Sequence, residues 1–149
     1  MPKAREVDLT QSKPRLLIAE DNQATSATLE RLVSPRFEVV AICNNGADAV
    51  RSALTLQPDV VLLGIVMPVL DGIQAARQIH AFDGNIKIVM VSGIEDQRFV
   101  SSAIEAGAQR YVFKRRLSTD LIVAIDAALE EDLEAPALDP VLLVKDLPQ

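Results

Sequence analysis

Residues 58–72 read PDVVLLGIVMPVLDG, and this stretch decides the fold class. Pro58 introduces an apolar run from Asp59 to Leu63 that has no polar face. A short run of branched residues without alternation is typical of a strand that is covered on both sides, as in a parallel sheet. Met67-Pro68 shapes the loop that follows, because proline keeps the preceding residue out of the helical region. Asp71 is expected to cap the next helix, as aspartate commonly does.

Strand-like and helix-like segments alternate on both sides of this stretch. We expect strands at 16–19, 37–43, 59–63, 86–91 and 111–113, and helices at 24–33, 46–56, 73–81, 96–106 and 118–130. Gly107 suits the C-terminal cap of the fourth helix, and Ser118 suits the N-cap of the fifth. Parallel strands need long crossover connections, which these helices supply. The sequence therefore predicts an α/β fold in which helices cover both faces of a five-stranded parallel sheet.

The chain has 149 residues, which corresponds to one domain of roughly 150 residues. We expect the folded domain to span 15–130, after a disordered leader at 1–14. The remaining segment, 131–149, is acidic and contains three prolines that exclude a continuous helix. It is interpreted as a flexible tail or a truncated linker. The alternative is a short segment, centred on the apolar residues Val141 to Val144, that docks on this domain or on a neighbour.

Composition excludes several classes of function. Fifteen Lys and Arg against 21 Asp and Glu give a net charge of −6, which argues against nucleic-acid binding by a basic face. The longest apolar stretch, 60–70, is far shorter than the ~18–20 residues of a membrane span. A single cysteine, Cys43, excludes an internal disulfide and is expected to be a small buried hydrophobe, whereas the single His80 is expected at the surface. We expect a cytoplasmic protein that contacts neither nucleic acid nor membrane.

The residues that could bind ligands or take part in chemistry lie at the ends of the predicted strands. In an open parallel sheet, ligands bind beyond the carboxyl ends of the strands. There the first strand ends in Glu20-Asp21, the fourth in Ser92 and the fifth in Lys114. Paired carboxylates suit Mg²⁺, while a hydroxyl and an ammonium suit phosphoryl oxygens. This set describes a pocket for metal-assisted phosphoryl transfer that lacks the carboxylate needed as nucleophile. No nucleotide-binding glycine motif is present either, so we expect no enzyme.

Together these motifs resemble the receiver domain of bacterial two-component response regulators. The resemblance covers about residues 15–130 and rests on Glu20-Asp21, the stretch 58–72, Ser92, and the pair Tyr111 and Lys114. It implies a flavodoxin-like, doubly wound sheet of five βα units with the strand order 2-1-3-4-5. The stretch 58–72 most resembles receivers of regulators that carry a C-terminal helix-turn-helix domain.

The resemblance also implies a role for each matching residue. Glu20, Asp21 and the backbone carbonyl of Val66 match the ligands of Mg²⁺. Ser92 and Lys114 match the groups that contact the phosphoryl group, and Tyr111 matches the aromatic residue that changes rotamer on activation.

The residue before I-x-M-P is the phospho-accepting aspartate in the family, and here it is Gly64. Asp59 does not replace it, because five residues of strand place it roughly 16 Å away at the opposite edge of the sheet. We therefore expect no phosphorylation at position 64 and a weakened or vestigial Mg²⁺ site. The absent side chain is expected to leave room beside Ser92 and Lys114, and Lys114 to turn toward Glu20 or Asp21.

Three interpretations of the function follow. The leading one is a receiver that is not phosphorylated and acts as a protein–protein interaction or dimerisation module. Its partner, a histidine kinase, an output protein or a second copy, would bind roughly residues 96–130. In the second, a conventional response regulator with a missing DNA-binding output domain has lost its acceptor at Gly64 through a recent or engineered change. In the third, the emptied pocket binds a small ligand, such as an anion held by Ser92 and Lys114.

Overall fold

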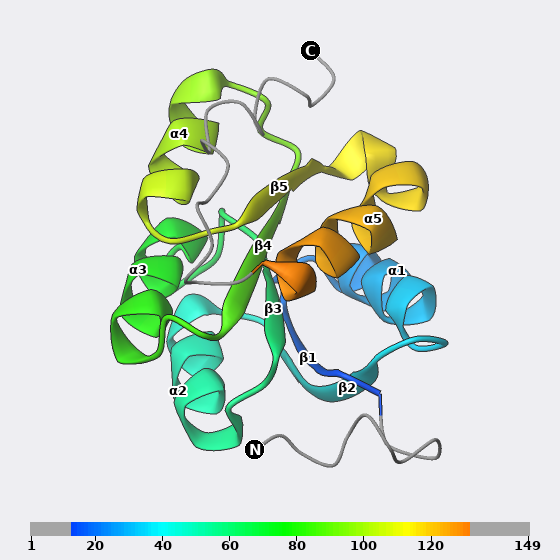
Figure 1. The fold of residues 1–149 in the computed structure, drawn as a ribbon. Helices are drawn as coiled ribbons and strands as arrows, with labels where there is room; N and C mark the ends of the chain where they lie inside the picture. Colours follow the sequence, from blue (N-terminus) through cyan, green and yellow to red (C-terminus); the bar gives the residue numbers. More distant parts are fainter. Residues whose placement is uncertain (1–12, 132–149) are drawn as a thin grey trace.

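A computed structural model of the chain describes residues 13–131, which form a parallel sheet between two layers of helices (Figure 1). The strand order within these residues is β2-β1-β3-β4-β5, as predicted. The strands are β1 (Arg15–Ala19), β2 (Glu38–Cys43), β3 (Val60–Leu63), β4 (Lys87–Ser92) and β5 (Arg110–Phe113). The helices are α1 (Gln23–Val33), α2 (Gly46–Leu56), α3 (Gly72–Phe82), α4 (Gln97–Glu105) and α5 (Leu117–Glu130), with a short 3₁₀ turn, η2 (Lys114–Arg116), before α5.

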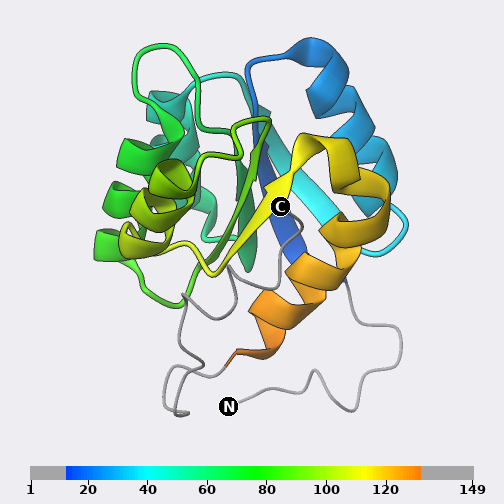
Figure 2. The ribbon, with the colours of Figure 1, turned by 90° about the horizontal axis from the view of Figure 1, so that it is seen from above.

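The two faces of the sheet are covered by different helices. Helices α1 and α5 pack on one face, and α2, α3 and α4 pack on the other (Figures 1 and 2). Successive strand residues point to opposite faces. Val61 and Leu63 of β3 accordingly join the core beneath α2, α3 and α4, while Val60 and Leu62 join the core beneath α1 and α5. All four residues are fully buried, which confirms the prediction of a strand without a polar face.

Two of the predicted helix ends agree with the structure. The side chain of Asp71 caps α3 by accepting the N–H of Gln74 at 2.9 Å. Gly107, two residues beyond the end of α4, has a φ of 120°, a conformation that favours glycine. A Cβ there would lie 2.6 Å from the Cγ of His80, so glycine is also required by space. His80 itself is exposed, as expected.

Other boundaries differ from the predictions for local reasons. Ser118 does not cap α5, because the chain continues from η2 directly into the helix at Leu117 and Ser118 lies within it. Asp59 precedes β3 instead of opening it, and its carboxylate accepts the backbone N–H of Arg15 at 2.8 Å. Phe37 precedes β2 but is 3% exposed, so its apolar side chain belongs to the core without belonging to the strand.

Both ends of the described chain are attached to the sheet. The carbonyl of Pro14 accepts the N–H of Glu38 at 2.8 Å, which extends the β1–β2 pairing by one residue. Glu131 accepts a hydrogen bond from Lys87 through its carbonyl and pairs with Arg110 at 2.8 Å through its carboxylate. The rest of the predicted leader and tail lies outside the described residues. Within 13–131, no helix is both long and apolar enough to cross a membrane.

The start of α3 lies against the backbone that leaves β3. The N–H of Gly72 donates to the carbonyl of Ile65 at 2.7 Å. A Cβ on Gly72 would lie 1.7 Å from the carbonyl oxygen of Gly64, a distance that backbone atoms cannot accommodate. Glycine at 72 therefore fixes the course of the loop between β3 and α3, and with it the position of residue 64.

We predict that Gly72→Ala lowers the free energy of unfolding by about 1–3 kcal/mol, because the new methyl group overpacks a backbone contact. The matched control is Gly84→Ala, whose Cβ would meet its nearest atom, in His80, at an ordinary 3.5 Å. The control should change stability by less than about 0.5 kcal/mol. Urea denaturation followed by circular dichroism measures both, and equal effects of the two substitutions would contradict the close-contact argument.

Candidate functional site

The predicted site residues meet at the carboxyl ends of the strands. There an open depression of about 360 Å³, which we call the strand-end depression, is bordered by residues that follow β1, β3, β4 and β5. Its lining includes Glu20, Asp21, Val66, Ser92 and Lys114. The tertiary structure thus brings together five residues that the sequence places up to 94 positions apart. Their proposed roles toward metal and phosphate stay predictions.

The turn from β1 into α1 determines how the two acidic residues point. The N–H of Glu20 donates to the carbonyl of Cys43 at 2.9 Å, so the backbone of Glu20 still pairs with β2. Asn22, not either acid, caps α1 by accepting the N–H of Thr25 at 2.9 Å. Glu20 is consequently buried, at 4% exposure, whereas Asp21 is exposed.

Lys114 pairs with Glu20, as the sequence led us to expect for one of the two acids. The Nζ of Lys114 lies 3.4 Å from Oε2 of Glu20, and the N–H of Asn22 donates to the same oxygen at 3.0 Å. The side chain of Glu20 is 2% exposed and that of Lys114 is 35% exposed. A carboxylate removed from water to this degree needs such partners, because an unpaired buried charge is strongly unfavourable.

Gly64 lies directly beneath the Glu20 carboxylate. Its N–H donates to the carbonyl of Ala19 at 2.9 Å, which continues the β1–β3 pairing past the end of the strand. A Cβ on Gly64 would lie 2.8 Å from Oε1 of Glu20. The space that a side chain at 64 would enter is therefore taken in part by Glu20. The room expected beside Ser92 and Lys114 is present as the strand-end depression, and Glu20 borders it next to residue 64.

Two side chains fasten the loop that follows β4. The hydroxyl of Tyr111 donates to the carbonyl of Ile94 at 2.7 Å, and Oγ of Ser92 accepts the N–H of Ile94 at 3.0 Å. Tyr111 is 1% exposed and its ring stands edge-on to Phe113, with the ring centres 5.8 Å apart. Burial raises the pKa of the Tyr111 hydroxyl, so the group stays protonated and able to donate.

A second pair of contacts holds the far end of the same loop. The guanidinium of Arg115 contacts both carboxylate oxygens of Glu95, at 2.6 and 3.1 Å. No sequence motif marks Ile94, Glu95 or Arg115 as part of the site. Ile94 acts here through its backbone, which the identity of its side chain does not reveal. The pairing of Glu95 with Arg115 joins the loop after β4 to η2, two segments that only the fold brings together.

The residues of the strand-end depression fit a divalent cation poorly in this arrangement. Its lining holds two carboxylates, and no group of three acidic, histidine or cysteine side chains within 13–131 is arranged to hold a metal ion. Oε2 of Glu20 already accepts from Asn22 and faces the Lys114 ammonium, whose positive charge opposes a cation beside it. We therefore derive no chemical step through a metal.

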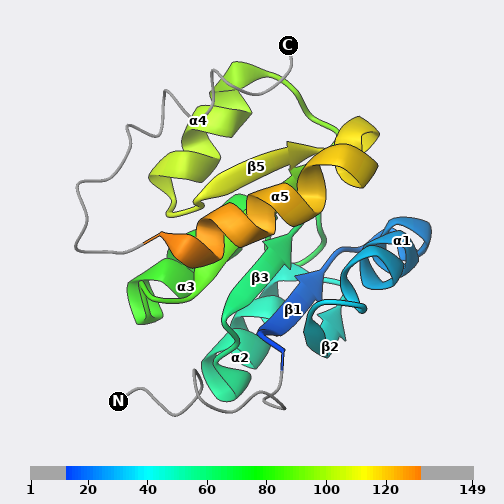
Figure 3. The ribbon, with the colours of Figure 1, turned by 45° about the vertical axis from the view of Figure 1, so that its right-hand side comes forward.

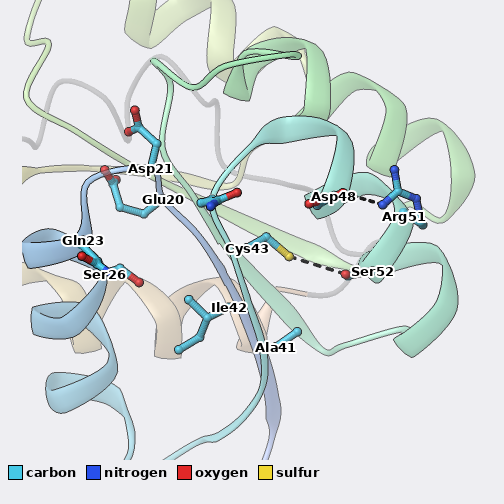
Figure 4. Close-up of a pocket in the computed structure, with 11 residues that line it drawn as sticks. Glu20, Asp21, Gln23, Ser26, Ala41, Ile42, Cys43, Asp48, Arg51 and Ser52 are labelled. Carbon is cyan, nitrogen blue, oxygen red and sulfur yellow. Dashed lines mark hydrogen bonds and ion pairs between the residues drawn. The ribbon is translucent and has the colours of Figure 1, made fainter.

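A larger depression of about 670 Å³ lies between α1, β2 and α2 (Figure 4). It shares Glu20 and Asp21 with the strand-end depression, and Cys43 contacts Ser52 in its wall, with Sγ 3.5 Å from Oγ. Cys43 is 8% exposed, in agreement with the expectation of a small buried hydrophobe. No sequence motif marks this depression, because its wall combines residues of α1, β2 and α2 that are separated along the chain.

Comparison with known proteins identifies the family. Residues 16–126 match the response regulator receiver domain, so the chain belongs to this family. It is 35% identical over 115 residues to the chemotaxis protein CheY of Listeria monocytogenes, covering 76% of this chain and 97% of that protein. It is also 32% identical over 123 residues to the transcriptional regulatory protein PrrA of Mycobacterium tuberculosis, which covers 83% of this chain but only 53% of PrrA.

Solved structures support the same assignment. A LuxR-family two-component response regulator from Aurantimonas superposes with a TM-score of 0.75 at 31% identity, covering 79% of this chain and 86% of the other. The response regulator domain of Thermotoga maritima CheB gives a TM-score of 0.75 at 26% identity, covering 80% and 98%. The flavodoxin-like receiver fold predicted from the sequence is thereby confirmed.

We predict that Tyr111→Phe loosens the loop after β4, because it removes the hydrogen bond to the Ile94 carbonyl and leaves the ring packing intact. The free energy of unfolding should fall by about 1 kcal/mol, the usual net value of such a bond. Amide hydrogen exchange at residues 93–96 should accelerate more than exchange in β1, which serves as the internal control. Unchanged exchange in the loop would show that Tyr111 does not fasten it.

The cap of α4 supplies a pH-dependent prediction. Asp96 accepts the N–H of Arg98 at 2.8 Å and pairs with its guanidinium at 2.7 Å. Hydrogen bonds from the Arg98 side chain and backbone lower the pKa of Asp96 to about 2. A depressed folded-state pKa means that the cap stabilises the helix above the ordinary value of 3.8 and loses this effect as the pH falls toward 2.

Carboxyl carbon NMR should therefore find the Asp96 titration midpoint near 2. In Arg98→Gln the midpoint should move upward, because the largest cause of the shift is the Arg98 side chain. A normal midpoint in the unmodified protein would refute the cap geometry.

Proposed function

We propose that this receiver domain works in two-component signalling without accepting a phosphoryl group at residue 64, as a non-enzymatic protein-interaction module. The observation that carries the proposal is the composition of the strand-end depression. Its lining within the described residues contains two carboxylates, Glu20 and Asp21, and residue 64 at the end of β3 is glycine. A glycine offers no nucleophile to a phosphoryl donor.

The two nearby aspartates in the stretch 58–72 support this view because both have other partners. Asp59 accepts the N–H of Arg15 at the start of β1. This is the opposite end of the strand pair from the strand-end depression. Asp71 accepts the N–H of Gln74 as the cap of α3, and it borders a different depression. Neither carboxylate faces Ser92 or Lys114 in the strand-end depression.

We propose the surface formed by residues 96–130 as the partner site. Helix α4, strand β5 and helix α5 lie side by side on one side of the molecule (Figure 3). Val123 on α5 is 67% exposed, so this region presents an apolar side chain to a partner. One of the similar structures is a complex of CheX with CheY from Borrelia burgdorferi. By analogy, the partner proposed here is a histidine kinase, an output protein or a second copy of the chain.

We propose that Glu20, Asp21 and the carbonyl of Val66 form only a weakened or vestigial Mg²⁺ site. These groups border one depression, but Glu20 is engaged by Asn22 and Lys114. Competition with these contacts supports the expectation of a weakened or vestigial cation site.

A second candidate function has its own supporting observation. Glu20, Asp21, Ser92 and Lys114 all remain around the depression, as they would in a conventional response regulator that recently lost its acceptor. The chain covers about half of PrrA, so an output domain in such a regulator is also consistent with the comparison. In this alternative, Gly64 is a loss-of-function change in an otherwise functional phosphorylation site.

Acetyl phosphate with Mg²⁺ tests the proposal and separates it from the alternative. We predict that the unmodified protein gives no acid-labile phosphoprotein by intact mass spectrometry, because no carboxylate is placed to accept. Stoichiometric labelling would overturn the proposal. The variant Gly64→Asn is the control, because asparagine has nearly the shape of aspartate but is not a phospho-acceptor. Labelling of Gly64→Asp without labelling of Gly64→Asn would favour a recent loss of the acceptor. Absence of labelling in all three would favour a module that works without phosphorylation.

A further inference from the structure

The Glu20 carboxylate lies close to three groups at once: the backbone of residue 64, the N–H of Asn22 and the ammonium of Lys114. Its Oε1 lies 2.8 Å from the position of a Cβ on Gly64. Its Oε2 accepts the N–H of Asn22 at 3.0 Å and lies 3.4 Å from the Lys114 ammonium. One carboxylate thus covers residue 64 and neutralises the cation of the depression at the same time.

Asp21 shows that this arrangement is specific to Glu20. The two acids are adjacent and border the same depression, but Asp21 is exposed and its carboxylate makes no hydrogen bond or ion pair with another residue of 13–131. Glu20 has the side chain that the backbone pairing with Cys43 directs inward. The negative charge that Lys114 faces is therefore supplied by one particular side chain and not by the acidic pair as a whole.

We infer that Glu20 is a built-in ligand of Lys114, which excludes external anions from the strand-end depression and keeps it in one state without phosphate. The inference rests on the proposed function in one respect: residue 64 carries no acceptor, so the lysine needs a different anionic partner. An external anion must displace a carboxylate that is already positioned beside the lysine, and an attached ligand acts at an effective concentration of about millimolar or more.

Glycine at 64 leaves the space that the Glu20 carboxylate occupies in this conformation. Any larger residue would bring its Cβ to 2.8 Å from Oε1, so the carboxylate would have to move away. Gly84 lies outside the depression, and a Cβ there would meet its nearest atom, in His80, at an ordinary 3.5 Å. The inward conformation of Glu20 therefore depends on the residue at 64, and Gly84 provides a control glycine that lacks this contact.

The ion pair between Glu20 and Lys114 also bears on the loop after β4. Ser92 and Tyr111 both hold Ile94 in this structure, and Lys114 directly follows β5, the strand that carries Tyr111. With the charge of Lys114 balanced from within, no external anion is required to keep these contacts. The surface around residues 96–130 is then presented in a single form that does not respond to phosphate.

Inorganic phosphate is the probe that tests the inference. Nitrogen–proton NMR titrations compare the unmodified full chain with Glu20→Ala and Asp21→Ala, which remove the same charge from the same depression. We expect saturable shifts at Ser92, Gly93 and Ile94 only in Glu20→Ala, with a phosphate affinity at least about tenfold higher than in Asp21→Ala. Equal affinity in the two variants, or tight phosphate binding by the unmodified chain, would overturn the inference.

A second pair of variants tests the same point without removing the buried carboxylate. Gly64→Ala should displace Glu20 and raise phosphate affinity, whereas Gly84→Ala, outside the depression, should leave it unchanged. A gain in Gly84→Ala equal to that in Gly64→Ala would overturn the inference. Phosphate titration involves no phosphoryl transfer, so its outcome is independent of the acetyl phosphate experiment. Labelling of the unmodified chain would overturn the proposed function, whereas absence of any anion gain in Glu20→Ala would overturn only the built-in ligand.

Discussion

The burial of β3 on both faces is the constraint on which the other features depend. Its four residues are fully buried between β1 and β4, and each one packs against a helical layer. A shift by one residue would place each of these side chains in the opposite helical layer, which is packed around different side chains, so the close packing of both cores opposes it. The position of residue 64 is therefore fixed at the end of the strand, beneath the side chains that follow β1, β4 and β5.

Close backbone contacts then define the surroundings of that place. Gly72 lies against the carbonyl of Gly64, and Gly64 in turn pairs with Ala19. These contacts leave little freedom in the loop after β3, and they present the backbone of residue 64 to the Glu20 carboxylate. The charge balance of the depression follows from packing: a buried acid and a half-exposed lysine are held together because their strands are held together.

The family relationship and the local chemistry give different kinds of information about this chain. Membership in the response regulator receiver family follows from the match over 16–126 and from the fold. Whether glycine at residue 64 prevents phosphorylation of the domain is a separate question, because a family match does not establish the function of each position. Here the relevant physical facts are the glycine itself, the carboxylate that covers it and the lysine that the carboxylate engages.

The sequence by itself determined the types and order of the elements, because apolar runs, helix breaks and caps such as Asp71 are local signals. It also indicated the sheet edge where Glu20, Asp21, Ser92 and Lys114 would gather, because the carboxyl ends of parallel strands share one edge. Only the tertiary structure decided that Glu20 and not Asp21 meets Lys114, that Glu20 reaches the space beside Gly64, and that Tyr111 bonds the backbone of Ile94. These contacts join strands far apart in the chain, and their distances depend on how the whole sheet and its helices pack.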